Sequence, residues 1–144
     1  IHGLIAGGAH VRRIKFFKSL KKRVVELGLK NEIDFIGHRD DLKEVMAISD
    51  IVLSLAKKPE AFGRTALESL SLGTPVVAYD HGGASEVLNM LFPDGLTPHN
   101  NIAKATKKIA SLYKTSNIIS TKNPFTQKAM IDKTIDLYEK SVLK

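Results

Sequence analysis

The sequence contains no cysteine among its 144 residues, so the chain can form neither a disulfide bond nor a thiolate metal site. Residence in the cytoplasm is therefore permitted. No apolar run approaches the about 20 residues that a membrane-spanning helix needs. Internal repeats and low-complexity tracts are also absent. What remains is one globular domain, long enough to bury an ordinary hydrophobic core.

The first residues lack the features of a signal peptide, because residues 1–10 are neither basic nor apolar over a sufficient length. The chain also begins with Ile1 rather than with Met. We therefore interpret the chain as a piece of a longer protein.

Negative charge is scarce, since 15 Asp and Glu stand against 22 Lys and Arg and leave a net charge of +7. Apolar residues at helical spacing predict an amphipathic helix over 11–28. The outer face of this helix consists of basic residues: Arg12, Arg13, Lys15, Lys18, Lys21, Lys22 and Arg23. We interpret it as a solvated face, and docking to an anionic membrane surface is the alternative.

Short apolar runs alternate with helical patterns along the chain, which is typical of an α/β fold with a parallel sheet. The runs predict strands at 3–6, 33–36, 50–55 and 75–79, the last two buried on both faces. Helices are expected at 11–28, 40–48, 63–72, 84–90, 101–115 and 125–143. Gly28 and Gly73 fit as helix ends, and 115–124 is expected to be a loop.

The segments that leave the four strands are rich in glycine and charge. They read Gly-Gly-Ala-His from residue 7, Gly-His-Arg from residue 37, Lys-Lys-Pro-Glu-Ala-Phe-Gly from residue 57 and Asp-His-Gly-Gly from residue 80. In an open parallel sheet the ligand lies at the carboxyl ends of the strands. Glycines and helix N-termini suit a phosphorylated ligand, although each glycine alone could simply make a tight turn.

Residues 59–86 carry the most specific pattern. They contain Pro-Glu-Ala-Phe-Gly, a second Glu eight positions after the first, Gly-Thr-Pro-Val-Val-Ala and Gly-Gly-Ala-Ser-Glu, in this order. The pattern resembles the family 4 (group 1) retaining glycosyltransferases, and the resemblance extends over at least residues 3–97. It implies a Rossmann-like three-layer α/β/α domain with a parallel sheet, one half of the two-domain GT-B architecture.

The resemblance identifies residues 1–144 as the C-terminal donor-binding domain. It implies an enzyme that transfers a hexose or related sugar from a nucleoside diphosphate sugar, with retention, to a glycan or lipid-linked acceptor. Such a protein belongs to polysaccharide or lipopolysaccharide biosynthesis in the cytoplasm, with peripheral membrane contact through the full-length protein. No cofactor, metal or nucleic-acid partner is expected.

By resemblance, Glu60 is the catalytic residue that contacts the donor sugar, and Glu68 binds the ribose of the nucleotide. Backbone N–H groups of Phe62, Gly63 and Arg64 are expected near the phosphates. From the residues alone, Glu68 could instead form an ion pair with Arg64, four positions earlier in the helix.

Four further residues are expected in the donor site: Gly82 and Gly83 line the pocket, and Gly37 and Arg39 lie where the base rests. Gly7, at the end of the first strand, is assigned to the same site. Arg39 could equally face solvent. Glu86 is interpreted as first-turn compensation of a helix dipole. Of the five histidines, His10 and His81 adjoin these glycines and could donate hydrogen bonds.

The sequence departs from the family in two places. The cations that face the leaving diphosphate and the acceptor domain are expected outside this chain, so the chain alone should bind donor weakly and transfer nothing. In addition, the acidic residue expected shortly after Gly95-Leu96 is replaced by His99, Asn100 and Asn101. Two other hypotheses stay open: a basic binding module for nucleic acid or membrane, and half of a sugar-nucleotide epimerase.

Overall fold

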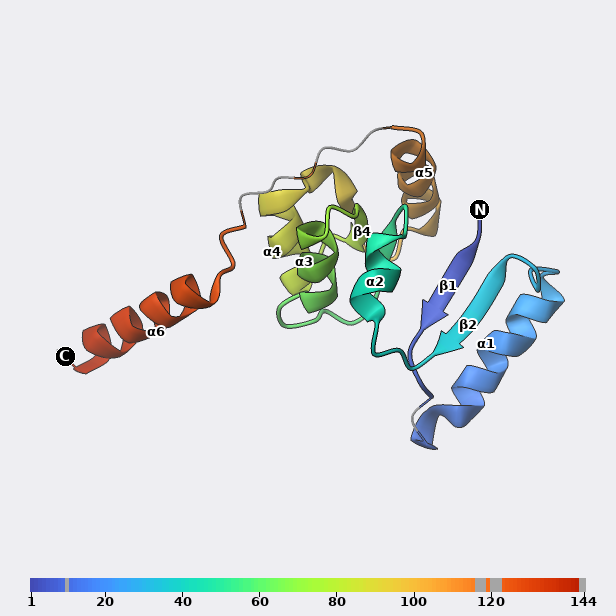
Figure 1. The fold of residues 1–144 in the computed structure, drawn as a ribbon, viewed down its shortest axis with the longest axis horizontal. Helices are drawn as coiled ribbons and strands as arrows, with labels where there is room; N and C mark the ends of the chain where they lie inside the picture. The colour runs from blue at the N-terminus through green and yellow to red at the C-terminus, as the bar shows by residue number, and fades with distance from the viewer. Residues whose placement is uncertain (10, 116–118, 120–122, 143–144) are drawn as a thin grey trace. The chain divides into compact units, whose positions relative to one another are not determined.

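The computed structural model describes residues 1–9, 11–115, 119 and 123–142, which fall into two compact units, 1–44 and 45–144. Every strand pair in both units is parallel. This confirms the α/β class with parallel strands (Figure 1). No helix in the described part of the chain is both long and apolar enough to cross a bilayer.

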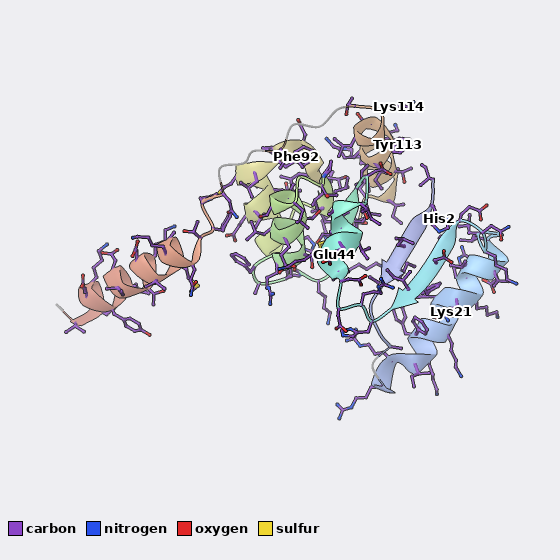
Figure 2. All side chains as sticks on the ribbon, viewed as in Figure 1. His2, Lys21, Glu44, Phe92, Tyr113 and Lys114 are labelled. Atoms are coloured by element: carbon purple, nitrogen blue, oxygen red, sulfur yellow. The ribbon has the colours of Figure 1, made fainter. Side chains whose placement is uncertain are left out.

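The first unit holds a two-stranded sheet and one long helix. Strand β1 (Gly3–Ala6) pairs with β2 (Ile33–Gly37), and a short 3-10 turn, η1 (Val11–Arg13), leads into α1 (Ile14–Glu26). The ring of Phe17 on α1 meets Phe35 on β2 edge-on, with centroids 5.4 Å apart. The Nζ of Lys21, labelled in Figure 2, lies 4.9 Å from the centre of the Phe17 ring. The apolar stripe of α1 therefore faces β2, and the basic residues described above remain exposed.

The second unit is built around the buried strand β4. Strands β3 (Val52–Ser54), β4 (Val76–Tyr79) and β5 (Leu96–Thr97) form a sheet in that order. All four residues of β4 are buried, as predicted. The same prediction for β3 is wrong, because Leu53 is 51% exposed and one face of the strand is therefore not buried. Strand β5 was not predicted, since two residues carry no pattern.

The described residues also contain five further helices and one 3-10 turn: α2 (Leu42–Ala47), α3 (Arg64–Ser71), α4 (Gly82–Leu91), η2 (Pro93–Gly95), α5 (Ile102–Tyr113) and α6 (Gln127–Val142). Their bounds agree with the predicted helices to within two residues. Gly28 and Gly73 follow α1 and α3 with positive φ angles of 70° and 83°, which confirms both as helix ends. The loop expected at 115–124 lies mostly outside the described residues.

The hydrophobic core of the second unit lies between β4 and the two helices α3 and α4, which pack against each other (Figure 1). Leu88 and Val87 of α4 are 0% and 1% exposed, and Leu70 of α3 is 3% exposed. Helix α5 contacts β4 and β5 and contributes Leu112 to the same cluster. This core fixes the carboxyl ends of β3, β4 and β5, where the motif residues lie.

We expect Leu88→Ala to lower the free energy of unfolding by about 2–5 kcal/mol, because it leaves a cavity in a closed core. Met90→Ala, on the same helix but 63% exposed, is the matched control and should change it by less than about 0.5 kcal/mol. Urea denaturation followed by circular dichroism measures both. Equal losses in the two variants would contradict this description of the core.

Candidate functional site

The loop that follows β3 and the start of α4 lie against each other at the carboxyl edge of the three-stranded sheet. We call residues 55–63 the Glu60 loop. The backbone N–H of Gly83 donates to the carbonyl oxygen of Glu60 at 2.8 Å. The Pro-Glu-Ala-Phe-Gly segment and the Gly-Gly pair, about twenty residues apart in sequence, are thus direct neighbours.

Three glycines make this approach possible because no side chain would fit. An ideal Cβ on Gly83 would stand 2.4 Å from Cα of Phe62, and one on Gly63 would stand 2.7 Å from Cα of Ala84. A Cβ on Gly82 would stand 2.8 Å from the carbonyl oxygen of Glu60. Real Cβ atoms do not come this close to backbone. Gly63 also has a φ of 82°, which residues with a side chain rarely adopt.

The carboxylate of Glu60 is held at the end of β3. Ser54, the last residue of that strand, donates from Oγ to Oε1 of Glu60 at 3.1 Å. Glu60 is half-buried, so its carboxylate is restrained yet accessible. With one oxygen engaged, the other keeps its capacity to accept hydrogen bonds from a ligand hydroxyl.

Helix α3 begins directly after the Glu60 loop with its N-terminus uncapped. Gly63 is the N-cap, and no described side chain accepts from the first turn. The N–H groups of Arg64 and its neighbours, together with the helix dipole, therefore present positive potential at this edge. Phe62 is 46% exposed, and its ring packs edge-on against Phe125 with centroids 5.8 Å apart. A phosphate group is the ligand that such an N-terminus prefers.

Glu68 lies inside α3, one turn after Arg64. Nη2 of Arg64 donates to Oε1 of Glu68 at 3.1 Å, which is the ion pair that the sequence offered as the alternative to ribose binding. The Arg64 side chain is 82% exposed, so this pair is worth little and can open. Ribose binding by Glu68 stays a prediction.

Two histidines hold the first half of the Glu60 loop. Nε2 of His81 donates to the carbonyl oxygen of Ala56 at 2.9 Å, and Nε2 of His99 donates to that of Lys57 at 3.0 Å. The two imidazole rings lie against each other with centroids 4.2 Å apart and their planes tilted by 37°, and the Tyr79 ring meets His99 edge-on at 5.5 Å. The sequence indicated His81 but missed His99, because the pairing of β5 with β4 brings them together. His10 lies outside the described residues.

In the first unit, Gly7 and Gly37 meet at the carboxyl edge of the two-stranded sheet. The N–H of Gly7 donates to the carbonyl oxygen of Gly37 at 2.7 Å. Both glycines have positive φ angles, 124° and 69°, at which the chain leaves its strands. Their turns leave the carboxyl ends of β1 and β2 adjacent, as the parallel arrangement predicts.

Arg39 follows Gly37 and is paired with Asp41. Its Nε donates to Oδ1 of Asp41 at 2.7 Å, and its Nη2 donates to Oδ2. Hydrogen bonding, reinforced by charge attraction, raises the pKa of Arg39 and lowers the pKa of Asp41. Both side chains are more than 40% exposed, so the pair fixes the direction of the guanidinium without adding much stability.

The comparisons with known proteins decide the family. The model of the family described as glycosyl transferases group 1 matches residues 1–130. The chain belongs to this family. The match favours the glycosyltransferase hypothesis over the epimerase half and the basic binding module.

Several relatives of this group 1 chain are similar in sequence or structure. The lipopolysaccharide core biosynthesis mannosyltransferase LpsB of Rhizobium meliloti is 34% identical over 85 residues, which cover 59% of this chain and 24% of LpsB. The structure of Anabaena HepE in complex with UDP is 30% identical with a TM-score of 0.72, over 77% of this chain and 30% of HepE. HepE has also been solved with UDP-glucose.

A glycosyltransferase from Rickettsia africae matches all of this chain and 40% of its own, with 28% identity and a TM-score of 0.80. Against the relatives named above, the chain spans only 24% of the LpsB length and 30% of the HepE length. The structural matches confirm the GT-B assignment of the fold.

The group 1 pattern loosens around residues 98–101, and the structure gives Asn101 a local role there. Its Oδ1 accepts from the N–H of Lys104 at 2.9 Å, so Asn101 caps α5. Asn101 can thus cap the helix without adding negative charge to this loop. Asn100, before it, has a φ of 56°, a conformation that Asn tolerates better than most residues.

The first-turn interpretation of Glu86 is wrong. Helix α4 begins at Gly82, two residues earlier than predicted, and this places the exposed Glu86 in the second turn. Gly82 and Gly83 consequently belong to the helix itself. In the described ranges, no three His, Asp or Glu side chains gather in a way that could hold a metal ion. Independence of a metal stays a prediction.

We expect Gly83→Ala to separate the Glu60 loop from α4, because the added methyl group would overlap the Phe62 backbone. The free energy of unfolding should fall by about 1–3 kcal/mol, and the amide NMR signals of Phe62 and Gly63 should move. Gly8→Ala, where the nearest atom is 4.0 Å away, is the control. Unchanged Phe62 and Gly63 signals in Gly83→Ala would refute the close packing.

We expect Arg39→Gln to raise the pKa of Asp41 toward its ordinary value of about 3.9, because the hydrogen bonds that favour the carboxylate are lost. A pKa lowered by folding stabilises the fold above the unfolded-state value, and this contribution disappears as the pH falls through the folded-state pKa. NMR titration of the Asp41 side chain measures this pKa with and without the substitution. Lys43→Gln removes a nearby charge without a hydrogen bond, and an equal rise in that control would contradict the assignment.

Proposed function

We propose that this chain binds a nucleoside diphosphate sugar, and that the protein to which it belongs transfers the sugar with retention of configuration. The observation that carries the proposal is the glycine-mediated packing on α4 of the Glu60 loop, which leads directly into the uncapped start of α3. The complexes of HepE with UDP and with UDP-glucose support this ligand class.

The proposed roles follow from the chemistry of each group. Glu60, restrained by Ser54, accepts hydrogen bonds from hydroxyls of the donor sugar. The N–H groups of Phe62, Gly63 and Arg64 bind the diphosphate, since they combine free donors with the positive end of α3. Glu68 exchanges its exposed partner Arg64 for the ribose hydroxyls.

Gly82 and Gly83 act by letting the loop and helix meet, because the Gly83 N–H is already used by Glu60. In the first unit, Gly37 and Arg39 are proposed to contact the base of the nucleotide, and Gly7 is proposed to bind the donor. Within the first unit, the Asp41 pair holds the Arg39 guanidinium plane in a fixed direction, and a flat cation of this kind stacks well on a base.

We place the chain as the C-terminal donor-binding domain of a hexosyltransferase, with a glycan or lipid-linked acceptor bound by another domain. The name of the Rhizobium relative supports lipopolysaccharide biosynthesis as the setting. We also propose a cytoplasmic location. Peripheral membrane contact would then come from the longer protein. Since the chain spans 24% of that relative, we further propose that the 144 residues alone transfer no sugar.

Titration of UDP and UDP-glucose into the chain, followed by amide NMR, tests the proposal. Both should shift the signals of Gly63, Glu68 and Gly83. Glu68→Gln should weaken both ligands by about tenfold, because it removes a charged acceptor for the ribose. Glu60→Gln should weaken UDP-glucose by a similar factor and leave UDP unchanged, because UDP lacks the sugar.

Glu139→Gln, on α6, has the same charge change and serves as the control. GDP and ADP titrations with their glucose conjugates establish which base is preferred. If none of the three nucleotides shifts Gly63, Glu68 or Gly83, the chain is not a donor-binding domain. If UDP-glucose and UDP respond equally to Glu60→Gln, the sugar contact of Glu60 is wrong.

A further inference from the structure

A pocket of about 390 Å³ lies on the side of the second unit formed by α5 and β5, and no role has been assigned to it above. Its lining combines the strand end with one face of the helix: Leu96, Thr97, Pro98, Lys104, Lys107, Lys108 and Ser111. The four polar residues of α5 recur at helical spacing, so they project to the same side.

The charged residues that line this pocket are all lysines. Between Gly95 and Ile131 the sequence contains six lysines and no Asp or Glu. Within the described part of the chain, none of the three pocket lysines forms an ion pair. Three unpaired ammonium groups on one helix face repel one another, and an anion between them would relieve this repulsion.

Thr97 provides a second and independent observation. It is 2% exposed, and its Oγ1 is the one buried side-chain nitrogen or oxygen, among the described residues, that has no hydrogen-bond partner. A buried hydroxyl without a partner destabilises the fold, whereas valine would fill nearly the same volume without that cost. A hydroxyl retained in this position has a physical reason if a bound group accepts its hydrogen bond.

We propose that the pocket binds a phosphate group, with Lys104, Lys107 and Lys108 supplying the charge and the hydroxyls of Thr97 and Ser111 donating hydrogen bonds. A phosphate has several acceptor oxygens, which suits both donor types. The phosphate can belong to a free phosphorylated compound or to a lipid headgroup. This site does not depend on the proposed function, because it shares no residue with the donor site.

Titration of inorganic phosphate at low salt, followed by amide NMR, tests the site. Saturable shifts should centre on Thr97, Lys107, Lys108 and Ser111. Replacing Lys104, Lys107 and Lys108 together by Gln should weaken phosphate by about tenfold or more. Replacing Lys30, Lys43 and Lys133 by Gln removes the same charge from three positions outside the pocket and should leave the affinity within about twofold.

Thr97→Val separates a ligand role from a structural one. The variant should weaken phosphate by about fivefold while the melting temperature stays the same or rises, because an unpaired buried hydroxyl is removed. A merely structural threonine would leave the affinity unchanged. Unsaturable shifts spread over all lysines, or an equal loss in the dispersed control, would overturn the proposal.

Vesicles of phosphatidylcholine with and without phosphatidic acid identify the source of the phosphate. Recruitment that requires phosphatidic acid and is lost in the pocket variant, but not in the dispersed control, assigns a lipid headgroup. Phosphate binding without recruitment assigns a free phosphorylated compound. Absence of both binding and recruitment rejects the site, whatever the outcome of the UDP titration.

Discussion

The site depends on the contact of two stretches of backbone that leave no room for side chains. The Glu60 loop and the first turn of α4 approach so closely that a methyl group on Gly63, Gly82 or Gly83 would overlap main-chain atoms. The Gly83 hydrogen bond then fixes the carbonyl of Glu60, and Ser54 fixes its carboxylate. Because backbone is stiffer than side chains, this contact sets the position of an exposed loop without burying it. The main structural role of Gly82 and Gly83 is therefore to allow this close packing.

The buried strand β4 positions the other segments at the carboxyl edge of the three-stranded sheet. Gly95 lies so close to β4 that a Cβ there would stand 2.0 Å from the Val76 carbonyl, and η2 can consequently lead the chain into β5 beside β4. The pairing of β5 carries His99 to His81, and both rings hold carbonyls of the Glu60 loop. The loop is thus restrained from both of its ends, by α4 and by the histidine pair.

Local patterns predicted most of the fold because its helices have clear apolar stripes and glycine ends, as at Gly28 and Gly73. They failed where a property depends on neighbours far away in sequence. Burial of β3 on both faces was predicted wrongly because it depends on what covers each face, and Leu53 is 51% exposed. Strand β5 was missed because two residues gain their strand geometry only from β4. For the same reason His99 could not be predicted as a partner of the Glu60 loop. The glycines of the motif indicated close backbone turns, and the structure shows such a contact between the Glu60 loop and α4. The ligand roles of the motif residues stay predictions.

Residues 95–111 include the segment in which the group 1 pattern loosens, and local contacts explain its sequence. Asn101 caps α5 without a charge, and residues 95–111 contain no Asp or Glu. Among the described residues, Lys104, Lys107 and Lys108 form no ion pair. An acidic cap at this position would lie one turn from Lys104 and would draw that charge away from the pocket. The uncharged Asn101, in the segment that departs from the family pattern, therefore preserves a positive electrostatic potential beside Thr97. The edge of the sheet then carries two kinds of anion-attracting feature: helix N–H groups at α3, and lysine side chains at α5.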